Sequence, residues 1–207
     1  APRADYYYDL ARFEANLSKR RELLEKALEA APDLLKRAEN SEYPEAIRNA
    51  NGGFSVILFF LAKTEMNFEE KRKLLEKALR HSNESTRLNE QLQPFVYWNR
   101  GIGHLILAAI KSELADLAKD PETRKTMLQE AILDYEIGVK FCIRGLYYEK
   151  EDSASLFAVL GIGQCEYGDL LSRLAEDREQ LRKTIRIFEE AAESFQKPDM
   201  ASRVAEC

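Results

Sequence analysis

The chain has 207 residues, of which 45% are hydrophobic and 32% charged, and its formal net charge is −5. This length is enough for a well-buried core in one domain or for a short array of stacked units. The acidic balance argues against general binding to nucleic acid, which requires a basic surface. Acidic and basic residues are also intermixed along the chain, which is typical of solvated helix faces.

The cysteines and the apolar runs of the sequence indicate where in the cell the protein is expected. Cys142, Cys165 and Cys207 form no Cys-x-x-Cys pair, so we expect reduced thiols and a cytoplasmic location. The longest apolar run, residues 56–62, is far shorter than the roughly twenty residues of a membrane helix, so we expect no membrane insertion. The start, Ala1-Pro2-Arg3, lacks Met, which indicates a trimmed piece of a longer protein and is compatible with a removed signal.

Apolar residues recur at spacings of three and four throughout, and strand-like alternation is absent, so the sequence predicts an all-α fold. A first helix is expected over about residues 5–15. Asn16 ends it and can cap the next helix, whose apolar face begins at Leu24. Pro32 predicts a turn or a kink, because proline cannot continue a helix without losing a hydrogen bond.

A second hairpin repeats the first. A long helix is predicted over residues 44–66, and Asn67 ends it. The segment Leu-Leu-Glu-Lys-Ala-Leu then occurs at residues 74–79, identical to residues 23–28, which indicates a repeat. A polar stretch, residues 81–93, follows.

The second half of the chain continues in the same way. A helix opens at Pro94 and reaches about Lys119. Asp120-Pro121 is a strong start signal for another, since Asp caps a helix and Pro suits its first position. Two further helices are expected over about residues 153–175 and 184–195. The sequence therefore predicts a single domain of about four hairpins, at residues 5–40, 43–90, 94–150 and 152–197, with the start of a further helix at 198–207.

These hairpins resemble those of tetratricopeptide repeat (TPR) proteins. Residues 131–140 are similar to the family's second helix, where small residues recur seven apart, and residues 24–32 are similar to its end. Tyr97 with Gly101, and Leu160-Gly161, resemble the aromatic and Leu-Gly positions of the first helix. The units are longer than the family's repeat of about 34 residues. The resemblance implies antiparallel hairpins stacked as a right-handed α-α superhelix, with the first helices lining a concave groove.

Glycines recur inside apolar, helix-patterned surroundings, at Gly52-Gly53, Gly101-Ile102-Gly103 and Gly161-Ile162-Gly163. A nucleotide-binding loop would have to follow a strand and open a helix, and neither Gly101 nor Gly161 does so. A glycine inside a helix costs roughly 1 kcal/mol relative to alanine, so its repeated use implies a gain in packing. We therefore predict that a side chain is omitted where a neighbouring helix approaches closely.

The sequence contains no catalytic or metal-binding constellation. His81 and His104 form no His-Glu-x-x-His motif and neither has a Glu three residues before it, so we expect no zinc or di-iron site and no cofactor. There is no Gly-x-Ser-x-Gly motif and no phosphate loop, and Cys165 has no histidine beside it in sequence. The sequence therefore predicts a protein that is not an enzyme.

The candidate site is a polar stripe on the first helices. Arg100, His104 and Lys111, called here the basic stripe, share one helix face. Aligning the glycines gives Arg100 and His104 the equivalents Asn51 and Ser55 earlier in the chain, and Leu160 and Gln164 later. Such residues either line the groove, or merely face water or satisfy one another. With the aromatic residues that are typical of interfaces, the predicted partner-binding residues are Asn51, Ser55, Tyr97, Trp98, Arg100, His104, Lys111 and Gln164.

We therefore expect a scaffold that binds a peptide or a partner protein in a groove formed by helices near residues 44–66, 94–119 and 153–175. The basic stripe favours an acidic segment or a C-terminal carboxylate. The alternative is a sensory or regulatory segment of a larger protein, which binds a small ligand in a pocket of a few hundred Å³ between hairpins. An apolar array end at Val204 and Ala205 would allow self-association, because helical arrays need polar caps.

Overall fold

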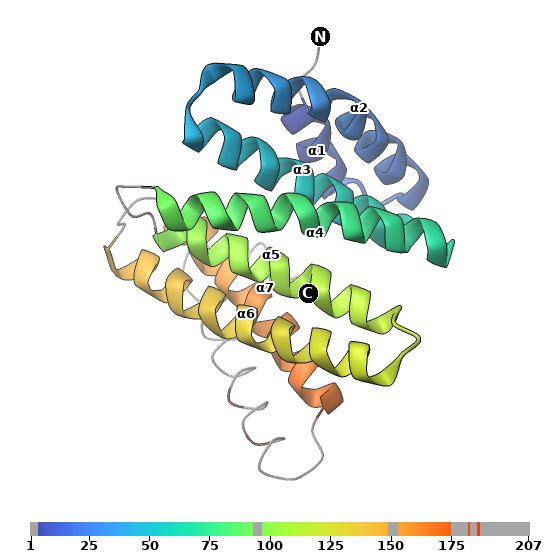
Figure 1. Ribbon diagram of the computed structural model, residues 1–207, viewed down its shortest axis with the longest axis vertical. Coiled ribbons are helices and arrows are strands. Elements are labelled where there is room, and N and C mark those ends of the chain that lie inside the picture. The colour runs from blue at the N-terminus through green and yellow to red at the C-terminus, as the bar shows by residue number, and fades with distance from the viewer. Residues whose placement is uncertain (1–3, 93–96, 149–152, 175–181, 183–185, 187–207) are drawn as a thin grey trace. The chain divides into compact units, whose positions relative to one another are not determined.

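The structure is a computed structural model (Figure 1). The residues that it describes are 4–92, 97–148, 153–174, 182 and 186. In this part of the chain all regular secondary structure is helical, which confirms the predicted all-α class. The chain forms two compact units by its internal contacts, namely residues 1–93 with 116–119, and residues 94–115 with 120–207.

The first unit holds two hairpins. Its helices are α1 (Ala4–Phe13), α2 (Leu17–Ser41), α3 (Pro44–Thr64) and α4 (Phe68–Gln91). Helix α1 packs on α2, α2 on α3, and α3 on α4 (Figure 1). Asn16 and Asn67 cap α2 and α4 as predicted: the Asn16 side chain accepts a hydrogen bond from Lys19 N, and that of Asn67 accepts from Glu69 N and Glu70 N. These bonds satisfy backbone donors that a first helical turn leaves open.

Helix α2 continues through Pro32, so of the turn or kink predicted there, the turn does not form. Proline inside a helix removes one backbone hydrogen bond and costs about 3 kcal/mol. Burial on both sides of the proline offsets this cost, because Ala27, Ala31 and Ala38 all lie in the core of the unit. Tertiary packing therefore outweighs the local signal.

The polar stretch after residue 80 is also helical, as far as Gln91. Three of its polar residues, Ser82, Ser85 and Asn89, are buried and follow one another at helical spacings of three and four. The stretch therefore belongs to the packed face of α4, although its composition resembles that of a connection.

The second unit holds α5 (Tyr97–Asp116), α6 (Pro121–Tyr148) and α7 (Ser153–Leu174). Asp120 caps α6 as predicted, since its carboxylate accepts hydrogen bonds from the backbone N (2.8 Å) and the hydroxyl (2.6 Å) of Thr123. The helices predicted over residues 184–195 and from residue 198 lie outside the described residues, Arg186 apart. The core of this unit is formed by buried residues of all three helices, including Leu105, Ala108, Leu128, Ala131, Tyr135, Cys142, Tyr167 and Leu170.

The capping residues Asn16, Asn67 and Asp120 mark equivalent positions of a repeat. The residues eight and eleven positions after each cap are of the same type and are buried. The buried matches on the second helices are Leu24, Leu75 and Leu128 at one position, and Ala27, Ala78 and Ala131 at another. The identical segments at residues 23–28 and 74–79 are therefore equivalent in structure as well as in sequence. The chain is built from helical repeats, as predicted.

Replacing Asn67 with alanine is expected to lower the free energy of unfolding by about 1 kcal/mol, because two backbone donors lose their acceptor. Chemical denaturation with linear extrapolation measures the change. Asn67→Asp keeps an acceptor and is the control, expected to unfold close to the wild type. An Asn67→Ala midpoint equal to that of the wild type would show that the cap does not stabilise α4.

Candidate functional site

The predicted site residues of the first unit are buried inside the hairpin formed by α3 and α4. Ser55 is 0% exposed, and its hydroxyl donates to the carbonyl oxygen of Ala78 at 3.0 Å. The Asn51 amide donates to Ile47 O at 2.9 Å and accepts a hydrogen bond from His81 Nδ1 at 2.8 Å. In these contacts the polar groups of α3 satisfy groups within their own hairpin.

The second unit contains a buried polar network between α5 and α6. His104, which is 9% exposed, places Nδ1 2.8 Å from Asp134 Oδ1. Lys111 Nζ lies 2.8 Å from Asp134 Oδ2 and 3.0 Å from Glu130 Oε2. Two of the three members of the basic stripe are thus bonded to one carboxylate on the neighbouring helix, and we call His104, Lys111, Glu130 and Asp134 the α5–α6 network.

Opposing effects set the pKa values within this network. Burial raises the pKa of the Asp134 carboxyl, but the hydrogen bonds from His104 and Lys111 outweigh it, so this pKa lies below its ordinary value. Burial lowers the pKa of Lys111, while its bonds to Asp134 and Glu130 bring it above its ordinary value. The network therefore holds a carboxylate and an ammonium group together at neutral pH.

The hydrogen bonds revise the alignment of the hairpins. Asn51 pairs with His81 and His104 pairs with Asp134, and each pair is separated by 30 residues. Aligning the two caps, Asn67 of α4 with Asp120 of α6, also places Asn51 opposite His104 in the alignment, so these two residues are equivalent. The glycine alignment, which made Asn51 equivalent to Arg100, is wrong by four residues, or about one helical turn.

Gly101 lies where α5 and α6 approach closely, as predicted. A Cβ atom at this position would collide with Cys142 Sγ and would stand 2.9 Å from Cys142 N and 3.1 Å from Gly138 O. Gly53 behaves differently, because an added Cβ would have no neighbour within 4 Å. The prediction of close approach is therefore confirmed for Gly101 and wrong for Gly53.

A second close contact between paired helices also involves a glycine. The glycine lies on the first helix of the hairpin in the first unit and on the second helix in the second unit. In the first unit Gly52 of α3 faces Ser85 of α4, whose Oγ would lie 3.1 Å from an added Cβ. In the second unit the equivalent positions hold Leu105 on α5 and Gly138 on α6, and a Cβ at Gly138 would lie 2.8 Å from Leu105 Cδ2. The small residue has moved from the first helix of the hairpin to the second.

Basic and aromatic side chains gather around Phe141 of α6. The Cζ atoms of Arg100 and Arg144 lie 5.7 and 5.9 Å from the centroid of its ring, within the range of cation–π contacts. The Tyr97 ring lies 6.3 Å away and the His104 ring is stacked on it at 6.2 Å. Arg144 is exposed, and the described residues give it no ion pair. We call Tyr97, Arg100, Phe141 and Arg144 the Phe141 cluster.

Sequence reasoning placed Arg100 and Tyr97 in the site but missed Phe141 and Arg144. The available signal was an aromatic residue followed by arginine at i+3, outside the apolar stripe of the second helix. Trp98 is partly buried against the core of the second unit, and Gln164 is 3% exposed. Binding of a partner by any of the eight predicted residues stays a prediction.

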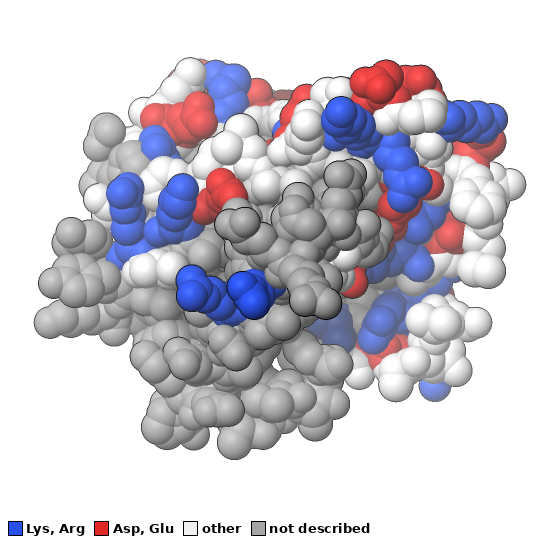
Figure 2. Space-filling model, turned by 90° about the horizontal axis from the view of Figure 1, so that it is seen from below, with Lys and Arg blue, Asp and Glu red and all other residues white. Residues whose placement is uncertain are grey.

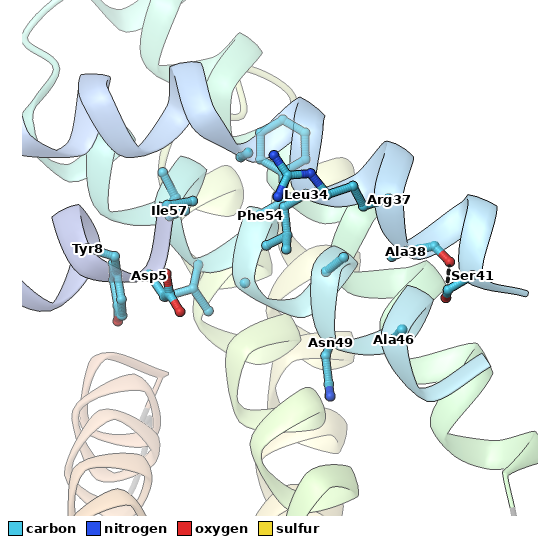
Figure 3. Close-up of a pocket in the computed structure, with 15 residues that line it drawn as sticks. Asp5, Tyr8, Leu34, Arg37, Ala38, Ser41, Ala46, Asn49, Phe54 and Ile57 are labelled. Atoms are coloured by element: carbon cyan, nitrogen blue, oxygen red, sulfur yellow. Dashed lines mark hydrogen bonds between the residues drawn. The ribbon is translucent and has the colours of Figure 1, made fainter. Parts of the chain in front are cut away.

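A half-open groove of about 610 Å³ lies among α1, α2 and α3 in the first unit (Figure 3). Its walls are mostly apolar, with Tyr8 from α1, Leu34 from α2 and Ile57 from α3. Ser41 also lines it, and its hydroxyl is bonded to the carbonyl oxygen of Ala38 at 2.6 Å. The volume matches the few hundred Å³ expected of a ligand site between hairpins, although the groove is not closed.

On the face shown in Figure 2, Lys and Arg side chains lie among Asp and Glu over the described residues. Several of these charges form pairs within one helix, such as Lys26 with Glu22 at 2.6 Å. In the described ranges, no three His, Cys, Asp or Glu residues come together in a way that could hold a metal ion. None of the described helices combines the length and the apolar character needed to cross a membrane.

The fold and the polar contacts inside its hairpins define a helical repeat protein. The chain is similar to a solved structure titled "DHF58 filament", with 20% identity and a TM-score of 0.44 over 92% of this chain and 88% of that one. It is also similar to the de novo designed helical repeat protein DHR64, with 20% identity and a TM-score of 0.41 over 92% and 89% of the two chains. No family model and no curated protein matches the sequence.

Proposed function

We propose that this helical repeat protein is a non-enzymatic scaffold that binds an acidic segment of a partner protein at the Phe141 cluster. The observation that carries the proposal is the pair of guanidinium groups, those of Arg100 and Arg144, beside the single Phe141 ring. Guanidinium groups bind carboxylates through two parallel hydrogen bonds, and arginine with aromatic residues is enriched among the anchors of interfaces. An acidic side chain or a C-terminal carboxylate fits this chemistry.

The polar contacts between α5 and α6 guide which residues we assign to such a partner. His104 and Lys111 are already bonded to Asp134, so their charges are balanced inside the hairpin. Arg144 is exposed and extends the basic surface onto α6 beside Arg100. The proposal therefore assigns the role expected of the basic stripe to Arg100 together with Arg144.

Helix α5 is the first helix of its hairpin, as the predicted groove requires. The proposal includes TPR-like stacking, in which such first helices line a concave binding surface. It also includes a cytoplasmic location, since sparse cysteines without a Cys-x-x-Cys spacing are usual in reducing compartments.

Charge reversal at both positions, Arg100→Glu with Arg144→Glu, is expected to weaken partner binding at least tenfold, or about 1.4 kcal/mol. Partners are captured on the tagged wild-type chain from an extract of its native cells and identified by mass spectrometry. Each is then purified and titrated against the wild type and the variant. Lys19→Glu with Lys36→Glu changes the net charge equally at exposed positions of the first unit and is the control.

Thermal unfolding checks that the charge-reversed chain remains folded, so that weaker binding reports on the surface. Partners whose affinity falls equally in the variant and in the control would point to net charge alone. Partners that bind the folded charge-reversed chain as tightly as the wild type would overturn the assignment to the Phe141 cluster.

A further inference from the structure

We propose that the groove among α1, α2 and α3 binds a small molecule that has an apolar chain and one carboxylate group. The groove lies within the first unit and shares no residue with the Phe141 cluster. An experiment that contradicts one proposal therefore leaves the other unaffected. The groove's volume of about 610 Å³ is within the range of small-molecule sites, roughly 300–1,000 Å³.

The groove exists because small residues line the facing sides of α2 and α3. Ala31 and Ala38 of α2 are two turns apart, and Ala46, Ala50 and Gly53 of α3 follow one another at spacings of four and three, so each set lies on one helix face. Gly53 needs no special backbone conformation, since no glycine with positive φ occurs among the described residues. With no atom within 4 Å of an added Cβ, it borders open space.

Apolar side chains remain accessible at the groove. Leu34, on α2, is 39% exposed although it lines a recess bounded by three helices (Figure 3). Ile57 forms part of the opposite wall and is buried. An apolar chain lying in the groove would remove the Leu34 surface from water, which is the general driving force for such binding. These walls account for the apolar part of the ligand.

Arginine at the groove accounts for the carboxylate. Arg37 lines the groove on α2, is exposed, and makes no ion pair or hydrogen bond with the described residues. The acidic residue of the lining, Asp5, belongs to α1, where its carboxylate accepts a hydrogen bond from Tyr6 N. In Figure 3, Arg37 and Asp5 come from different helices, so the groove has a basic side and an acidic end.

A second arginine, Arg48, precedes the lining residue Asn49 in α3. Arg48 is only 9% exposed, yet its guanidinium donates to a neutral acceptor, the Asn49 Oδ1 atom, at 3.1 and 2.9 Å. Burial lowers the pKa of Arg48, and the nearby Glu45 partly opposes this effect. Buried charges in proteins are ordinarily paired with an opposite charge. Arg48 is not part of the groove lining, so the carboxylate of the ligand is assigned to Arg37.

Calorimetric titration of the full chain with decanoate, decanol and decyltrimethylammonium, each below its micelle-forming concentration, tests the inference. We expect decanoate to bind with one molecule per chain and at least about tenfold more tightly than decanol, with the cation weakest. Arg37→Gln should reduce the decanoate affinity about tenfold and leave the decanol affinity unchanged. Lys36→Gln removes a neighbouring charge outside the groove and is the matched control, expected to bind like the wild type.

Gly53→Leu fills the groove from α3 and should abolish binding of decanoate and decanol, while thermal unfolding shows that the chain is folded. Equal affinities for the three probes would show an apolar surface without carboxylate recognition and would overturn the proposal. The proposal also fails if decanoate does not bind, or if Gly53→Leu leaves its binding intact. A wild type that is dimeric in sedimentation, becomes monomeric with Gly53→Leu and binds no decanoate would assign the groove to a second copy of the chain instead.

Discussion

Replacing Asp134 with alanine is expected to lower the free energy of unfolding by about 3–5 kcal/mol, the largest effect predicted for a single residue here. The carboxylate accepts hydrogen bonds from His104 and Lys111 in a largely buried position. Its removal leaves the Lys111 ammonium with Glu130 alone, whose side chain is 54% exposed. A partly buried charge that loses its main partner is costly, because desolvation is no longer fully offset.

A double-mutant cycle separates the network from simple loss of packing. Lys111→Met with Asp134→Ala leaves no unpaired buried charge, so we expect it to cost less than the sum of the two single substitutions by at least about 1 kcal/mol. Urea denaturation of the four proteins supplies the numbers. Strict additivity, or an Asp134→Ala variant within about 1 kcal/mol of the wild type, would contradict a coupled network.

The same network gives stability a definite dependence on pH. The folded pKa of Asp134 is depressed, so its contribution is present above the unfolded value of about 3.9 and is lost as pH falls through the folded pKa. The folded pKa of Lys111 is raised, so its contribution is complete below the unfolded value of about 10.4 and is lost as pH rises through the folded pKa. Asp134→Asn should therefore lose less stability than the wild type on acidification.

Gly101→Ala and Gly53→Ala are expected to change stability in opposite directions. Alanine favours the helix over glycine by roughly 0.5–1 kcal/mol, and at Gly53 the added methyl group meets no neighbour, so this variant should be more stable than the wild type. At Gly101 the methyl group would collide with Cys142 Sγ and stand 2.9 Å from Cys142 N, a backbone atom that can yield only if the two helices move apart. We expect a net loss of about 1–3 kcal/mol there.

Thermal unfolding of the two variants measures the difference, since 1 kcal/mol corresponds to roughly 2–4 °C in a chain of this size. The two substitutions are chemically identical and both lie inside helices, so each is the control for the other. A Gly101→Ala variant that melts at or above the wild-type temperature would show that the α5–α6 contact is not as close as described.

Local signals in the sequence were sufficient for the helix ends. Asn16, Asn67 and Asp120 cap helices through bonds to residues two or three positions away, so the pattern and the structure depend on the same few atoms. Pro32 gave a local signal of the same kind and the turn did not form, because the burial of its neighbours depends on distant helices. Where tertiary contacts decide, local patterns are insufficient.

In the candidate site, too, local patterns predicted features of single helices, whereas contacts between helices were not predicted. Helical spacing correctly placed Arg100, His104 and Lys111 on α5, but their partners Asp134 and Phe141 lie on α6. Which residue of α6 meets which residue of α5 depends on the register of the two helices, and the glycine alignment gave the wrong register between hairpins. The groove among α1, α2 and α3 depends on small residues from separate helices, and no single helix contains that information.

The position of glycine also distinguishes the α3–α4 hairpin from the α5–α6 hairpin. Helices α4 and α6 carry equivalent buried residues, Leu75 with Leu128 and Ala78 with Ala131, so they present similar surfaces during folding. Opposite Gly52 stands Ser85, whereas opposite Leu105 stands Gly138. Exchanging the second helices would press Ser85 against Leu105 in one hairpin and leave a void between two glycines in the other. A chain of near-copies thereby discourages mispairing among its own repeats, and a recombined or consensus version would have to exchange both helices of a hairpin together.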